Sequence, residues 1–223
     1  KGVYRSGKGY AEFDFNRKLG LRLKEILEKH GVTVVTEPNY ANKAESLTGR
    51  TNFFNAQKVD ILVSLHANAG VPDAHGRCVF YWHDSSKGKR LATLVRDEIG
   101  AKGYSLHGNG LHASVRGSWT DLHMVRESWM PAILIEHGFM THHTDFELIF
   151  GNKQAQYIEH MAEADAKAIL AYFGIAFKGA GTRPSQPVIS GKVLYRVQTG
   201  AYASKKNAED LLKELKGKGF DAI

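Results

Sequence analysis

The chain has 223 residues, of which 43% are hydrophobic and 24% charged, and its formal net charge of +7 gives a pI near 9.4. This length accommodates one sizeable domain and a small second one. No apolar run reaches the length of a transmembrane helix, and no N-terminal signal peptide is visible. The one cysteine, Cys78, excludes an internal disulfide.

The positive charge favours a polyanionic partner, but no basic helix, zinc-finger spacing or aromatic nucleic-acid motif is present, so we expect no binding of nucleic acid.

Hydrophobic periodicity predicts helices and strands that mostly alternate along the chain. The first helix has an apolar stripe from Phe15 to Leu27 at spacings of three and four residues, and Gly31 is expected to end it. In chain order the patterns predict a helix over 13–30, a strand over 32–36, a helix over 46–57, a strand ending at 66, a strand over 76–82, a helix over 86–100, a short strand over 122–125, a strand ending at 136 and a helix over 154–173. This alternation indicates an α/β fold with a mainly parallel twisted sheet and helices on both faces.

The C-terminal part has a different character. A Gly-, Pro- and Ser-rich stretch over 178–187 lacks periodicity and is typical of a linker. We therefore expect a main domain over 1–176, a linker over 177–191 and a second domain over 192–223. The second domain contains a strand-like, a helical and another strand-like pattern, at 193–200, 205–216 and 220–223. So short a segment buries too little apolar surface to fold alone, so this small α+β domain looks truncated at its C-terminus.

Two of the predicted strands end in reactive side chains, His66 and Glu136. α/β enzymes present ligands and bases from such strand ends. Histidine and carboxylate ligands, with a further Glu as base, are typical of a hydrolytic zinc site. Structural interpretations stay open as well. A strand-end histidine is often only hydrogen-bonded, and Glu12 at the start of the first helix suits the positive end of the helix dipole.

Four motifs together resemble the zinc-dependent N-acetylmuramoyl-L-alanine amidases over residues 9–173. They are Glu12 before a long helix, Ser64-Leu65-His66-Ala67-Asn68, Leu122-His123-Met124-Val125-Arg126-Glu127 and Leu134-Ile135-Glu136-His137-Gly138-Phe139. The resemblance implies that Glu12 and His66 bind Zn²⁺ and that Glu136 is the catalytic carboxylate. It implies a peptidoglycan hydrolase in which a zinc-activated water cleaves the amide bond between N-acetylmuramic acid and the L-alanine of the stem peptide.

One part of the family pattern is not found in this sequence. The family opens with a strand and a loop whose histidine is the first zinc ligand, whereas no histidine precedes His30 here. We therefore expect the third ligand to be a histidine upstream of Lys1.

The resemblance also suggests partners. His123 and Arg126 lie in the third motif and are candidates for substrate binding, and Arg126 is also a candidate for pairing with a carboxylate. The segment Val197-Gln198-Thr199-Gly200-Ala201-Tyr202 resembles the opening of the sporulation-related (SPOR) repeat, a family that binds peptidoglycan glycan strands. The expected partners are therefore the glycan strands and stem peptide of peptidoglycan, with anionic wall polymers as a further match for the positive charge. We expect a monomer that acts at the cell wall, as a secreted autolysin or a phage endolysin.

Two other functions stay open. A zinc aminopeptidase or carboxypeptidase shares the α/β layout, but such enzymes commonly hold two metals, and the sequence shows no extra cluster of Asp and Glu. A metal-free, non-catalytic amidase homologue that binds or regulates at the wall is favoured only by the missing first ligand. Zinc content and chelator-sensitive release of dye from labelled sacculi would separate the three.

Overall fold

The computed structural model describes residues 2–37, 46–179, 213 and 217. The chain forms two compact units, Lys1–Gly181 and Thr182–Ile223, and every element below belongs to the first. The predicted C-terminal domain and most of the predicted linker lie outside the described residues. Their boundaries stay a prediction.

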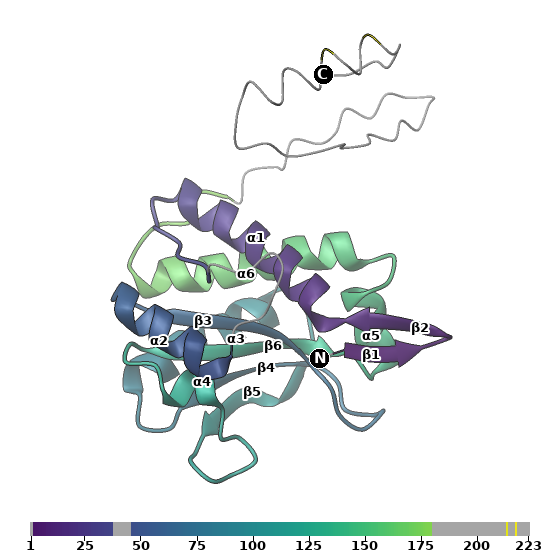
Figure 1. The fold of residues 1–223 in the computed structure, drawn as a ribbon, viewed down its shortest axis with the longest axis horizontal. Coiled ribbons are helices and arrows are strands. Elements are labelled where there is room, and N and C mark those ends of the chain that lie inside the picture. Colours follow the sequence, from purple (N-terminus) through teal and green to yellow (C-terminus); the bar gives the residue numbers. More distant parts are fainter. Residues whose placement is uncertain (1, 38–45, 180–212, 214–216, 218–223) are drawn as a thin grey trace. The chain divides into compact units, whose positions relative to one another are not determined.

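A four-stranded sheet forms the centre of the first unit, in the order β3-β6-β4-β5 (Figure 1). The strands are β3 (Leu62–Asn68), β4 (Arg77–Trp82), β5 (Leu106–Ser114) and β6 (Ala132–Phe139). β3 runs parallel to β6, and β4 runs parallel to β5, while the central pair β4 and β6 is antiparallel. The predicted α/β fold with a mainly parallel sheet is therefore confirmed, with one antiparallel pair that the sequence did not indicate.

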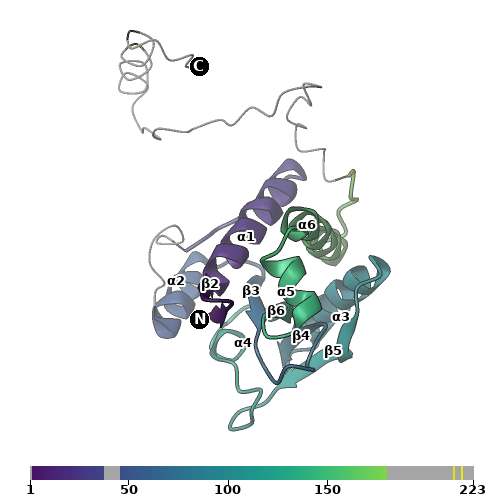
Figure 2. The same ribbon diagram turned by 90° about the vertical axis from the view of Figure 1, so that its right-hand side faces the viewer.

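Helices cover both faces of the sheet, but unequally (Figures 1 and 2). The long helices α1 (Glu12–Lys29), α3 (Ser86–Ala101) and α6 (Gln154–Tyr172) pack on one face, and α2 (Leu47–Gln57) and the short α4 (His123–Arg126) lie on the other. Side chains alternate along β6 as a pleated strand requires. Ile133 and Ile135 join the core under the long helices, whereas Leu134 joins the smaller core under α4.

The long-helix layer is closely packed because α6 is rich in alanine. Its buried alanines are Ala162, Ala164, Ala166 and Ala168. Small side chains let α1 and α3 both lie against α6. Among the helices within residues 2–37 and 46–179, none is both long and apolar enough to span a bilayer.

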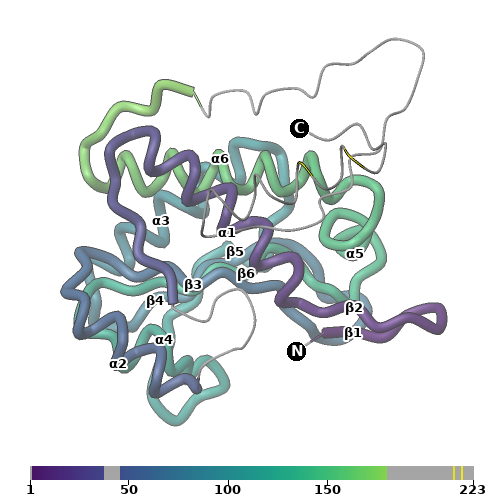
Figure 3. Tube along the Cα trace, turned by 45° about the horizontal axis from the view of Figure 1, so that its top comes forward, coloured from purple at the N-terminus to yellow at the C-terminus, as the bar shows by residue number. Residues whose placement is uncertain are grey.

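A small antiparallel hairpin, β1 (Gly2–Arg5) and β2 (Lys8–Ala11), forms a separate sheet. Figure 3 shows that it leads directly into α1. The hairpin packs on α5 (His143–Ile149) through the Tyr10 and Phe146 rings, whose centroids are 4.8 Å apart, and through the Arg5 guanidinium over Phe146. It thereby anchors the start of α1, where Glu12 lies.

Several predicted elements are confirmed, two are wrong, and the strands predicted to end at 66 and 136 continue to Asn68 and Phe139. α1, α2, α3 and α6 lie within a residue or two of their predictions, and Gly31 ends α1 with a left-handed φ of 81°. The strand predicted over 32–36 is irregular, because its β-branched residues have no partner strand among the described residues. The strand predicted over 122–125 is the helical turn α4, whose Met124 and Val125 pack against the sheet. β5 and the hairpin were not predicted.

Candidate active site

Parallel pairing of β3 with β6 places His66 directly beside Glu136. Both side chains lie on the face that carries α2 and α4, because they share strand parity with Leu62 and Leu134 of that core. The antiparallel register of β4 adds Cys78 on the other side of Glu136. Three strands thus bring a histidine, a carboxylate and a thiol into one row across the sheet.

Glu12 reaches this row from the first turn of α1. Its Oε1 atom lies 2.8 Å from His66 Nδ1 and accepts hydrogen bonds from the Ala67 backbone N–H at 3.2 Å and from Asn16 Nδ2 at 3.1 Å. Glu12 is only 7% exposed, so its charge is held by these donors rather than by water. The second His66 nitrogen, Nε2, lies 3.0 Å from Ser64 Oγ. His66 and Glu12 are therefore locked in one geometry.

The environment shifts the pKa of two groups in the row. Burial alone would raise the pKa of Glu12, but the hydrogen bonds from His66, Asn16 and Ala67 outweigh it and lower the pKa to about 2. Burial, and then the negative charge of Glu136, raise the pKa of the Cys78 thiol to about 12. Glu12 is thus a carboxylate and Cys78 a neutral thiol at neutral pH. The thiol has no nucleophilic role there.

The Glu12–His66 pair suits zinc in its chemistry, since a carboxylate oxygen and an imidazole nitrogen are common zinc donors. A catalytic zinc site takes three protein ligands, however, and among residues 2–37 and 46–179 no group of three or more candidate ligands occurs. The described residues therefore fit two of the three positions. The expected histidine upstream of Lys1 would lie outside them and stays a prediction.

A buried polar contact on the opposite face of the sheet supports this row of residues. His137 follows Glu136 in β6 and points to the opposite face, where it and Asp165 of α6 are fully buried, with Nε2 3.0 Å from Asp165 Oδ2. His137 Nδ1 lies 3.3 Å from the His66 carbonyl oxygen, and Tyr157 donates a 2.7 Å hydrogen bond to the His137 carbonyl. These contacts fix the ends of β3 and β6 relative to α6.

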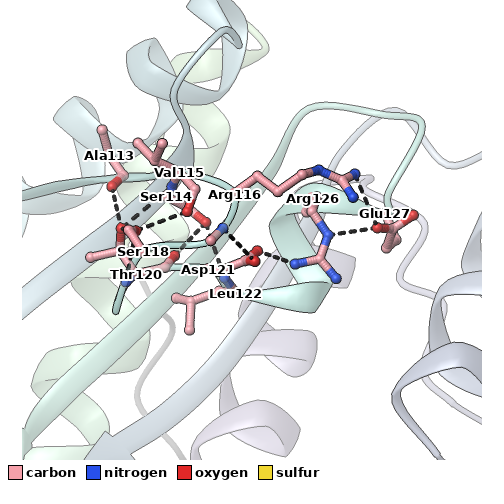
Figure 4. Close-up of polar contacts among 11 residues, drawn as sticks. Ala113, Ser114, Val115, Arg116, Ser118, Thr120, Asp121, Leu122, Arg126 and Glu127 are labelled. Carbon is pink, nitrogen blue, oxygen red and sulfur yellow. Dashed lines mark hydrogen bonds and ion pairs between the residues drawn. The ribbon is translucent and has the colours of Figure 1, made fainter.

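The two candidates for substrate binding lie on α4 and have partners of their own. His123 Nε2 lies 3.2 Å from Thr51 Oγ1 of α2. Arg126 pairs with Asp121 and, through Nε at 2.6 Å, with Glu127 (Figure 4). The sequence interpretation of Arg126 as a carboxylate-pairing residue agrees with these contacts, while binding of substrate by either residue stays a prediction.

Sequence reasoning did not single out Asn16, Ser64 or Asp165. Asn16 lies four residues after Glu12 on one helix, and Ser64 two residues before His66 on one strand face, so both spacings contained a signal. No spacing in the sequence indicated Asp165, because it lies 28 residues after His137, with α5 between them.

Two family models match parts of this chain. A family model described as N-acetylmuramoyl-L-alanine amidase matches residues 1–171, and a SPOR domain model matches residues 162–223. The two matches overlap within α6, which belongs to the first compact unit.

Individual relatives point the same way. The sporulation-specific N-acetylmuramoyl-L-alanine amidase of Bacillus subtilis is 27% identical over 98% of this chain and 77% of its own length. The endolysin of Bacillus phage SPP1 is 27% identical over 81% of this chain and 65% of its own length.

Among solved structures, the amidase AmiC2 of Nostoc punctiforme is 31% identical with a TM-score of 0.64, and the alignment covers 78% of this chain and 91% of that one. An amidase of Clostridium difficile 630 is 28% identical with a TM-score of 0.67, and the alignment covers 78% of this chain and 90% of that one. The chain therefore belongs to the N-acetylmuramoyl-L-alanine amidase family.

Proposed function

We propose that this protein is a zinc-dependent peptidoglycan hydrolase that cleaves the amide bond between N-acetylmuramic acid and the L-alanine of the stem peptide. The observation that supports it most directly is the row in which Glu136 pairs in register with His66, while His66 contacts Glu12 at 2.8 Å. We propose that Glu12 and His66 are two zinc ligands and that the expected upstream histidine is the third. Zinc, when bound, would polarise the scissile carbonyl and increase the acidity of the attacking water.

Each described residue has a distinct role in this proposal. Glu136 removes a proton from the attacking water and delivers it to the amine of L-alanine as the amide bond breaks. Asn16 and the Ala67 backbone hold Glu12 ionised and oriented. His123 and Arg126 border the substrate from α4. We propose action at the cell wall, with the C-terminal SPOR domain bound to glycan strands.

The test compares three substitutions in the zinc-loaded protein. Glu136→Gln is expected to retain zinc and wall binding and to lower the rate of peptide release by at least about 10²-fold, the usual contribution of a general base. Glu12→Ala and His66→Ala are expected to lose zinc. The control is Glu28→Gln, which removes an exposed carboxylate from the same helix as Glu12 and should change neither measurement.

The readouts are metal analysis and mass spectrometry of the products from purified sacculi. Release of peptides with a free N-terminal L-alanine supports the amidase. Removal of single amino acids from peptides that stay attached to the sugar would indicate an exopeptidase. Wall binding without bound zinc and without release of peptides would indicate the non-catalytic homologue. If Glu136→Gln released peptides at the normal rate, Glu136 would not be the base.

A further inference from the structure

The loop between β5 and α4 carries a tryptophan, Trp119, that is 80% exposed. This ring is not isolated. Its centroid lies 6.2 Å from that of Phe80 and 6.0 Å from that of His112, both in edge-to-face geometry. Phe80 and His112 are register partners on β4 and β5, and their rings stack at 5.1 Å. The three rings form an aromatic step whose outer member faces solvent.

The aromatic step lies beside the candidate active site, on the same face of the sheet. Phe80 pairs with Leu134, and Glu136 is two residues further along β6. Such diagonal neighbours are about 7–8 Å apart, which puts the Trp119 ring on the order of 10–15 Å from Glu136. A disaccharide spans a distance of this size.

Hydrogen bonds, rather than burial of the tryptophan, hold this loop in place (Figure 4). Thr120 Oγ1 donates to the Ala113 carbonyl at 2.9 Å, and Ser114 Oγ donates to the Thr120 carbonyl at 2.6 Å. Asp121 accepts from the Gly117 N–H at 2.8 Å and pairs with Arg126. The backbone on both sides of Trp119 is therefore held in place before any ligand arrives, which reduces the entropy lost on binding.

The surface around the aromatic step is close to neutral. Arg126 is paired with Asp121 and Glu127, and Arg116 Nη2 lies 3.8 Å from Glu127 Oε1. The two carboxylates therefore balance the positive charges of the two arginines. Burial, followed by repulsion from His107, lowers the pKa of His112, so that its ring is uncharged at neutral pH.

We propose that Trp119, supported by Phe80 and His112, stacks against a sugar ring of the glycan strand next to the muramoyl residue whose amide bond is cleaved. This subsite rests on the proposed amidase function. A pyranose presents an apolar C–H face to a flat aromatic ring, and an uncharged N-acetylated sugar matches a neutral surface. The stem peptide carries carboxylates and matches it less well.

A pair of substrates tests this assignment. One is a stem peptide on N-acetylmuramic acid alone, and the other is the same peptide on a glycan tetrasaccharide. Trp119→Ala should raise KM for the tetrasaccharide about tenfold, as loss of an exposed tryptophan anchor does, without changing kcat or the KM for the single-sugar substrate. Trp119→Phe should recover most of the affinity. The matched control is Trp129→Ala, because Trp129 is 84% exposed but precedes β6 at the end far from Glu136.

Tryptophan fluorescence provides a readout that does not depend on catalysis. All three tryptophans, at positions 82, 119 and 129, lie in the first compact unit, so sugar binding by residues 182–223 adds no tryptophan signal of its own. Titration with N-acetylglucosamine tetrasaccharide should change the fluorescence of the wild type and of Trp129→Phe in a saturable way. Trp119→Phe should lose this change.

An equal rise in KM on both substrates, a wild-type KM for Trp119→Ala, or an equal effect of Trp129→Ala would overturn the sugar subsite. If the wild-type protein released peptide from neither substrate, the amidase proposal itself would fail. The fluorescence titration would still report on sugar binding at Trp119, so the two failures are distinguishable.

Discussion

The buried contact between His137 and Asp165 leads to a quantitative prediction about stability. Both side chains have no exposed surface, and Asp165 Oδ1 has no hydrogen-bond partner among the described residues. Asp165 therefore depends on His137 for compensation of its burial. Replacing one partner of a buried pair leaves the other uncompensated and typically costs about 3–5 kcal/mol.

His137→Phe and Asp165→Leu are each expected to lower the free energy of unfolding by about 3–5 kcal/mol. For a protein of this size that corresponds to a fall in Tm of about 6–20 °C. The double variant should lose less than the sum of the two single losses, because an apolar pair removes the desolvation penalty, although Leu is larger than Asp and overpacks its site by about 1–3 kcal/mol. Phe at 137 should keep the packing of this position against Phe15, whose ring centroid is 6.2 Å from that of His137.

Urea denaturation of the four proteins, with thermal melts alongside, measures this coupling. Single variants that each lose less than about 1 kcal/mol would show that the pair does not depend on mutual compensation. A double variant whose loss equals the sum of the two single losses would refute the reasoning in the same way.

Two further predictions concern residues outside this pair. Cys78, with a pKa raised to about 12 by burial and by the charge of Glu136, should not react with Ellman's reagent at pH 8 until denaturant is added, and rapid labelling of the native protein would contradict this. Ser85→Ala should cost about 1 kcal/mol and lower Tm by about 2–4 °C, because Ser85 Oγ accepts the Gly88 N–H at 3.0 Å and caps α3. Ser85→Thr should keep most of this stability, and an unchanged Tm for Ser85→Ala would show that the cap contributes nothing.

The long elements were predictable because their local pattern and their final environment agree. β3 and β6 are apolar runs in a sheet covered on both faces, and α1 has a continuous apolar stripe that ends at Gly31. The placement of His66 and Glu136 on two buried strands was visible for the same reason, although these strands continue beyond the predicted ends, to Asn68 and Phe139. Their direct pairing was not, since the sequence contains no information on which strands are neighbours.

The missed elements depend on contacts that the local sequence does not show. β5 contains Gly108 and Gly110 with φ of 59° and 75°, which interrupt the alternation of a strand and shift its register with β4. The hairpin has few apolar residues and is held by a tight turn and by α5. Residues 122–125 are apolar because they cover the sheet, and four residues do not distinguish a strand from a helical turn.

The unequal layers on the two faces of the sheet have a consequence for divergence between relatives. The alanines of α6 lie against two helices at once, so a larger side chain there would overpack the layer at about 1–3 kcal/mol per site. The face that carries α2 and α4 has fewer interlocking helices, and its loop over residues 115–121 is stabilised by its own hydrogen bonds. Substitutions and insertions should therefore accumulate beside Glu136 and His66 without loss of the fold. In this architecture the preference for particular walls can change while the chemistry is kept.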